Sequence, residues 1–345
     1  MDTVNEWRIF QGTGQPHDGI DRLPAPPSWR QFGHTAEVAE TALIDARDYD
    51  ATRTVQRGQS FRIPADQPDL INVVNAALYL RRPLMITGKP GTGKTSLAYA
   101  VAHELKLGPV LLWSITARST LQEGLYRYDA IARLQEAQVK LNRKDMIEGE
   151  ANQDIGRYIQ LGSVGTALLP SRRPRVLLID EVDKSDINLP NDLLNLFEEG
   201  EYEIPELARM AQQVETVQVR TYDGAEAQVT AGLVRCYAFP LIVLTSNGER
   251  DFPPAFLRRC LRLTIQDPDK TALTEIVRAH LGEAVLEKAE PLIAQFVAKR
   301  QEGDLAPDQL LNAVYLVTRK LSPIETDQSK LMDLLLKYLS SAEDR

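Results

Sequence analysis

The stretch that most constrains what this chain can fold into is LMITGKPGTGKTSLA, at residues 84–98. It matches the pattern G-x-x-x-x-G-K-[ST], with Gly88, Gly93, Lys94 and Thr95 in the fixed positions. Such a loop leaves its backbone N–H groups free to bind phosphate oxygens, while the lysine reaches the outer phosphates and the threonine hydroxyl binds Mg²⁺. An apolar run precedes the loop and a helical pattern follows it, so a plain glycine turn is disfavoured and a nucleoside triphosphate site is predicted.

A second apolar run ends in two acidic residues, in RPRVLLIDEVDKSD at residues 173–186. Ligands bind beyond the carboxyl ends of the strands in open α/β sheets, where Asp180 and Glu181 would lie. We expect Asp180 to hold Mg²⁺ through water and Glu181 to orient and deprotonate the attacking water; two exposed loop acids are the alternative. The expected nucleotide-binding residues are Gly88, Pro90, Gly91, Thr92, Gly93, Lys94, Thr95, Ser96 and Asp180, and the expected metal ligands are Thr95 and Asp180.

Two further polar features follow downstream. The apolar run PLIVLTSN at residues 240–247 ends in Ser246 and Asn247. The Asn247 amide can bind the γ-phosphate or the attacking water, or it can cap the next helix. The stretch PPAFLRRCLRLTI at residues 253–265 places Arg258 and Arg259 on a short helix before a final strand.

Five apolar runs alternate with helical patterns, at residues 84–87, 109–116, 176–179, 240–247 and 261–265. This alternation predicts an α/β fold, a P-loop doubly wound parallel sheet, followed by a small all-helical lid domain. The expected domains are an irregular N-terminal arm (1–60), the α/β nucleotide-binding domain (61–266) and the helical lid (267–345). The lid has two apolar stripes, Leu310, Leu311, Val314, Val317 and Leu321, then Leu331, Leu334, Leu335 and Leu339.

Other segments are less regular. The arm is rich in proline, glycine and aspartate, and its Trp7 and Trp29 are expected to dock it on the chain's own core, with a neighbouring subunit as the alternative. Residues 117–144 read as an amphipathic helix broken near Gly124.

Composition narrows the function classes. The formal net charge is −8, which argues against a nucleic-acid partner. The N-terminus has no signal-peptide pattern and no run reaches 18 apolar residues, so we expect a cytoplasmic protein with no membrane partner. Cys236 and Cys260 are expected to be reduced, buried packing residues, and the four histidines form no zinc pattern.

Together, GKPGTGKTSLA, VLLIDEVDKSD, LTSNGE and FPPAFLRRC resemble the motifs of AAA+ ATPases, and within them the MoxR-like group. The resemblance implies that Asn247 is the sensor-1 residue and that Arg259, or Arg258 beside it, is an arginine finger acting on a neighbouring subunit. It also implies ATP and Mg²⁺ as ligands, a ring homo-oligomer expected to have six subunits, and a protein partner, commonly one with a von Willebrand factor A domain.

Two positions depart from the MoxR-like pattern. Gly248 stands where proline often follows the sensor asparagine, and Asp308 stands where the lid helix usually carries the sensor-2 arginine. The stretch 194–207 resembles the helix and hairpin insert of the MoxR branch. No N-K-x-D motif follows any strand, which favours ATP over GTP.

Three functions follow as hypotheses. The first is an ATP-hydrolysing ring that remodels a protein partner. The second is a nucleotide-gated assembly scaffold, as in a bacterial conflict or defence system. The third is a nucleic-acid translocase, with a pore lined by basic residues: Arg133, Lys140, Arg143, Lys144, Arg172, Arg173 and Arg175.

Overall fold

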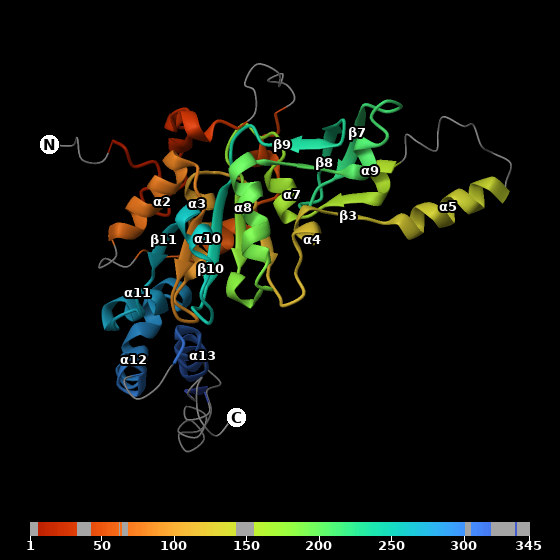
Figure 1. Cartoon of the computed structure of the whole chain (residues 1–345). Coiled ribbons are helices and arrows are strands. Elements are labelled where there is room, and N and C mark those ends of the chain that lie inside the picture. Colours follow the sequence, from red (N-terminus) through yellow and green to blue (C-terminus); the bar gives the residue numbers. More distant parts are fainter. Residues whose placement is uncertain are drawn as a thin grey trace.

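The centre of the molecule is a five-stranded parallel sheet (Figure 1). The structure is a computed structural model of the whole chain, and it describes residues 6–32, 43–61, 63, 68–142, 155–300, 305–318 and 335–336. In the order β11-β1-β10-β5-β2, the strands are β11 (Leu261–Thr264), β1 (Leu84–Thr87), β10 (Leu241–Ser246), β5 (Val176–Asp180) and β2 (Leu111–Ser114). All four pairings are parallel, so every strand ends at the same edge.

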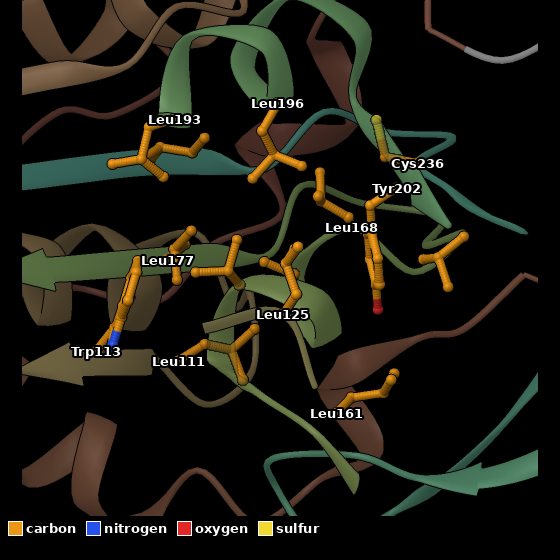
Figure 2. Close-up of a cluster of buried hydrophobic side chains, with 14 of the residues drawn as sticks. Leu111, Trp113, Leu125, Leu161, Leu168, Leu177, Leu193, Leu196, Tyr202 and Cys236 are labelled. Carbon is orange, nitrogen blue, oxygen red and sulfur yellow. The ribbon is translucent and has the colours of Figure 1, made fainter. Parts of the chain in front are cut away.

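Each face of this sheet packs against a separate hydrophobic core. Successive side chains of a strand point to opposite faces, so a single strand can contribute to both cores. On β1, Leu84 and Ile86 pack against α2 (Pro68–Leu80) and α3 (Lys94–Glu104). Met85 belongs to the core on the other face, together with residues of α7 (Ser163–Ala167), α8 (Leu189–Glu199) and α10 (Pro254–Arg259). Figure 2 shows part of this second core, including Leu177 of β5 and Leu193 of α8. The predicted doubly wound α/β fold is confirmed.

A second sheet, of six strands, was not predicted. Its order is β3-β4-β7-β8-β9-β6, with β3 (Tyr126–Tyr128), β4 (Ile159–Leu161), β6 (Glu201–Glu203), β7 (Thr216–Arg220), β8 (Glu226–Thr230) and β9 (Leu233–Arg235). The 3₁₀ helix η5 (Ile155–Tyr158) leads into β4, and α9 (Pro205–Ala208) follows β6. The hairpin expected within 194–207 therefore lies later, where β7 pairs with β8.

The amphipathic helix expected over 117–144 is interrupted by a strand. It divides into α4 (Leu121–Leu125), β3 and α5 (Ala130–Asn142), so the predicted break near Gly124 is present and is filled by a strand. Antiparallel pairing with β4 accounts for the interruption, since it satisfies the backbone of residues 126–128 outside a helix. Ile131, Leu134 and Val139 of α5 are exposed rather than part of the core.

The N-terminal arm follows the surface of the central domain. Its described elements are η1 (Gly19–Arg22), η2 (Ser28–Arg30), η4 (Ala46–Asp48) and α1 (Thr52–Ser60), and the last is a regular helix where irregular loops were expected. The buried Glu104 carboxylate accepts hydrogen bonds from the N–H groups of Gln11, Gly12 and Gly14. Trp7 is 41% exposed but lies against Tyr79, as expected for docking on the chain's own core, whereas Trp29 is 77% exposed.

The C-terminal helices lie together at one end of the molecule (Figure 1), and their side chains form a core of their own. They are α11 (Lys270–Leu281), the 3₁₀ helix η7 (Glu283–Val285), α12 (Leu286–Arg300) and α13 (Pro307–Thr318). Leu310 and Val314 are buried in this core, as predicted. Leu321, Leu331, Leu334 and Leu339 lie outside the described residues. Over the part of the chain that the structure describes, no helix has the length and apolar character needed to cross a membrane.

Both thiols are buried, as predicted, and burial raises the pKa of Cys236 and of Cys260 to about 12. Because the thiolate is the reactive form, both side chains should remain protonated and unreactive at pH 8. We expect a thiol reagent to label the native protein slowly and the urea-unfolded protein rapidly. Rapid labelling of two thiols in the native protein would contradict this expectation.

Candidate active site

The glycine-rich loop joins β1 to α3 at the carboxyl edge of the central sheet. Gly91 and Gly93 adopt left-handed backbone conformations, with φ of 78° and 87°, which side chains of L-residues rarely adopt. A Cβ atom on Gly91 would also lie 2.8 Å from Cδ of Pro307, at the start of α13. Glycine is therefore required here both by the turn and by the close approach of the C-terminal helices.

Lys94 is the first residue of α3 and is buried. Its ammonium donates hydrogen bonds to the carbonyl oxygens of Gly88 at 2.6 Å and Lys89 at 2.7 Å. Burial lowers its pKa, and the nearby carboxylates of Asp183 and Asp180 partly offset that effect. Among the described residues, no carboxylate forms an ion pair with this ammonium. The loop thus presents a cation suited to an anionic ligand.

The acidic end of β5 lies directly beside the loop. Asp180 Oδ1 accepts hydrogen bonds from the hydroxyl groups of Thr95, at 2.9 Å, and Thr245, at 2.6 Å. The pairing of Leu244 with Ile179 in the sheet places Thr245 next to Asp180. A hydroxyl and a carboxylate oxygen in contact form the hard-oxygen donor set that Mg²⁺ prefers, so the predicted pair of ligands fits the metal. Thr245 was not predicted as a site residue, because the sequence shows it only as a polar residue within an apolar run.

Glu181 adopts a left-handed conformation, with φ of 60°, which is uncommon outside glycine. Its N–H donates to the Thr245 hydroxyl at 2.8 Å, which ties this unusual turn to the neighbouring strand. Its carboxylate accepts a 2.7 Å hydrogen bond from Lys184, and this bond raises the pKa of the lysine. This hydrogen bond occupies Oε2, one of the two carboxylate oxygens of Glu181.

Asn247 is brought close to the acidic segment through Asp183, a residue that sequence analysis did not single out. Asp183 Oδ2 accepts hydrogen bonds from the N–H groups of Asn247, at 2.9 Å, and Glu249, at 3.2 Å. Asp183 lies in the 3₁₀ helix η6 (Val182–Lys184) and is 5% exposed. Its other oxygen is buried and has no hydrogen-bond partner within the described part of the chain. Asp183 therefore clamps the turn that carries Asn247 against the end of β5.

We expect Asp183→Ala to lower the free energy of unfolding by about 1–3 kcal/mol, because the hydrogen bonds from the N–H groups of Asn247 and Glu249 to the Asp183 carboxylate are lost. Asp183→Asn keeps one carbonyl oxygen and should lose less. Asp251→Ala, which removes an exposed acid from the same segment, is the matched control and should leave the urea midpoint unchanged. Equal midpoints for Asp183→Ala and Asp251→Ala would show that the clamp does not hold this turn.

The two arginines lie at the opposite edge of the sheet. They end α10, directly before β11, and the start of β11 is level with the start of β1. Arg259 donates through Nε to Glu198 at 2.6 Å and through a terminal nitrogen to the Ala255 carbonyl. Arg258 is exposed. The structure therefore does not bring either arginine to the P-loop of its own chain. The acid that binds Arg259 is Glu198, rather than Asp251 or Asp267, which are nearer in the sequence.

The C-terminal helices approach the loop with an acidic residue. Asp308 lies in the first turn of α13, directly after Pro307, which contacts Gly91. Lys89 of the loop forms an ion pair with Asp267 at 3.4 Å, where the chain enters the C-terminal helices. Asp308, which stands where the sensor-2 arginine is usual, therefore directly follows a residue that packs on the loop.

The proposed basic pore lining is wrong for two residues. Arg175 is buried and bound to Asp223 at 2.6 Å. Arg173 is bound to Asp21 and Asp45. Both therefore serve internal contacts rather than a channel wall. Arg143 and Lys144 lie outside the described residues.

Comparison with known proteins identifies a family. A family model described as the AAA domain, dynein-related subfamily, matches residues 83–260, just over half of the chain. The matched segment runs from the residue before β1 to the residue after α10, so it includes the loop, the acidic strand end, Asn247 and both arginines. No curated protein matches the chain.

Proposed function

The chain belongs to the AAA domain family, dynein-related subfamily, and from this premise we propose that it is a MoxR-like ATPase that works as a ring. In this proposal each subunit binds and hydrolyses ATP at the interface with its neighbour and uses the cycle to remodel or activate a protein partner. The family supports a nucleotide-hydrolysing P-loop ATPase in general. The MoxR-like assignment, the ring of six and the partner are our inference.

One observation carries the proposal. The loop, Asp180 and Glu181 lie at the carboxyl edge of the central sheet, whereas Arg259 lies at the amino edge. The step from Pro83 to Gly88 along β1 spans about 16 Å, at roughly 3.3 Å per residue. Arg259 therefore cannot reach the nucleotide of its own subunit. A second copy of the chain is the source of the missing positive charge, and AAA proteins commonly form rings.

The residues have distinct tasks in this proposal. Lys94 binds the outer phosphates in place of the two loop carbonyls that it contacts now. Thr95 and Asp180 hold Mg²⁺, which offsets phosphate charge when it is bound. Glu181 accepts a proton from the attacking water, and Asn247 orients that water or the γ-phosphate from the turn that Asp183 clamps.

A second candidate function is a nucleotide-gated scaffold, in which ATP controls assembly and hydrolysis only resets it. The position of Asp308 beside the loop favours it, since an acid there repels phosphate instead of coupling the C-terminal helices to it. A nucleic-acid translocase is disfavoured, because Arg173 and Arg175 are engaged in internal ion pairs.

Mass measurement and turnover assays separate these functions. We expect the mass to rise from one subunit to a ring when a non-hydrolysable ATP analogue and Mg²⁺ are added. ATP turnover should be stimulated by a partner with a von Willebrand factor A domain and not by duplex DNA. Stimulation by DNA would favour the translocase, and nucleotide-dependent assembly without stimulation by either would favour the scaffold. A protein that stays monomeric at every concentration would refute the ring.

A further inference from the structure

A cavity of about 270 Å³ opens at the amino edge of the central sheet, where Arg259 lies. Its charged lining consists of Arg30, Arg82, Arg259 and Glu198, and Trp29 stands at the same opening, 77% exposed. Three positive charges against one negative charge leave a net charge of +2 in this lining. A cavity with this charge favours an anion.

The nearest hydrogen-bond acceptors of Arg30 do not cancel its positive charge. Arg30 is only 8% exposed, and its guanidinium lies over the rings of Phe32 and Phe239. It donates to the carbonyl oxygens of Arg81 at 2.6 Å and Phe197 at 2.9 Å. These acceptors are neutral, so they hold the guanidinium in place without cancelling its charge. Nε of Arg30 is buried and has no hydrogen-bond partner within the described residues.

Glu198 is the one acid in the lining, and two arginines share it. One carboxylate oxygen accepts from Arg259 at 2.6 Å, and the other accepts from Arg30 at 3.4 Å. The Glu198 and Arg259 side chains are both more than a third exposed, so solvent screens their ion pair. A weak, screened pair is one that a doubly charged phosphate group can displace.

Arg82 lies beside Arg259 because of the strand register. Leu84 pairs with Leu261 across β1 and β11, and each arginine precedes its paired leucine by two residues. The N–H of Leu261 also donates to the Pro83 carbonyl at 2.8 Å, which extends this alignment toward the arginines. Both arginines line the cavity, and guanidinium groups are suited to binding phosphate oxygens.

The proposed function places the terminal phosphate of a neighbour's ATP at Arg259, and we propose that Arg82 is a second arginine for that phosphate in the same cavity. Arg82 binds that phosphate beside Arg259, and Glu198 holds Arg259 until the phosphate displaces it. The inference rests on the proposed function and deepens it, by naming a second arginine and a displaceable acid in the interface. It also selects Arg259 rather than Arg258, since Arg259 lines the cavity.

The first arm of the test measures phosphate binding without hydrolysis. Lys94→Ala, which disables the loop, is titrated with inorganic tripolyphosphate while Trp29 fluorescence is followed, and Trp29→Phe identifies the signal. Adding Arg82→Gln should weaken binding about tenfold, as expected for loss of one charge-assisted hydrogen bond. Adding Glu198→Gln should strengthen it, and the exposed Arg220→Gln, which removes the same charge elsewhere, should leave it unchanged. Equal affinities for Arg82→Gln and Arg220→Gln, or no binding, would overturn the phosphate assignment.

The second arm asks whether the phosphate comes from a neighbour. Arg82→Gln subunits mixed with Glu181→Gln subunits should recover ATP turnover, because some interfaces combine an intact cavity with an intact loop. Arg82→Gln mixed with Arg259→Ala should not recover, because every cavity then lacks one arginine. Recovery in the second mixture, or failure in the first, would overturn the assignment to a neighbour's ATP.

The two arms separate this inference from the proposed function. If the wild-type protein neither assembles nor hydrolyses ATP, the ring ATPase is refuted and the neighbour assignment falls with it, while the titration still decides whether the cavity binds phosphate. If the wild type is an active ring and the Arg82→Gln variant keeps full turnover, the proposed function stands and this inference is refuted.

Discussion

Replacing Arg259 with alanine is expected to lower ATP turnover by about 10³–10⁵, the effect of an arginine supplied by a neighbouring subunit. Nucleotide affinity should be retained, because Arg259 lies at the edge of the sheet away from the loop of its own chain. Steady-state hydrolysis and binding of a fluorescent ATP analogue, measured on the same preparations, provide the two readouts. Arg258→Ala is the comparison, and it should lose much less activity, since Arg258, unlike Arg259, does not line the cavity.

Mixing variants tests whether Arg259 acts on a neighbour. Arg259→Ala and Glu181→Gln should each have little activity alone, but a mixed ring contains interfaces with an intact loop on one side and an intact arginine on the other. Turnover should therefore recover in the mixture, and wild-type turnover per subunit should rise steeply with protein concentration. If mixed rings form and no activity returns, Arg259 only holds the fold through Glu198.

Glu181→Gln is expected to slow ATP hydrolysis by about 10²–10⁴, the usual contribution of a general base, while ATP still binds. The amide is close in size to the carboxylate but cannot accept the proton of the attacking water. The hydrogen bond from Glu181 N–H to Thr245 involves only the backbone of residue 181, so the left-handed turn should be retained. The matched contrast is Lys94→Ala, which should lose binding itself because the outer phosphates lose their main cation.

Single-turnover hydrolysis and equilibrium binding distinguish these two variants. Glu181→Gln should trap ATP and assemble into rings, and Lys94→Ala should do neither at the same nucleotide concentration. Wild-type hydrolysis by Glu181→Gln would show that another group accepts the proton. Lys184→Ala offers a further check, because it frees the Glu181 carboxylate from its ion pair without removing the base.

The parts of the site predicted from sequence are those whose chemistry is contiguous along the chain. Gly88 to Ser96 form one loop and helix start, and Asp180 and Glu181 follow a single buried strand. Local spacing therefore carries the information, and the contact between Thr95 and Asp180 agrees with their predicted shared role. The five parallel strands were predicted for the same reason, since each is a short apolar run flanked by helical or polar segments.

The second sheet was missed because its strands depend on distant partners. Residues 126–128 carry no strong strand pattern and become β3 through pairing with 159–161, while β6 pairs with β9 after an intervening helix and hairpin. The break that was predicted near Gly124 separates α4 from α5, but the strand that fills it was not predicted, because β3 depends on its pairing with β4.

By itself, the sequence predicted membership of the AAA+ proteins, the P-loop and the doubly wound sheet, because each depends on residues close together in the chain. Tertiary structure alone decided that Thr245 and Asp183 hold the site, and that Glu198 binds Arg259. These contacts join residues more than 60 positions apart. They arise from the register of neighbouring strands and the packing of α8 against α10, which no local pattern encodes. Separation of the arginines from the loop likewise follows from the parallel direction of the strands, which places every strand start at one edge and every strand end at the other.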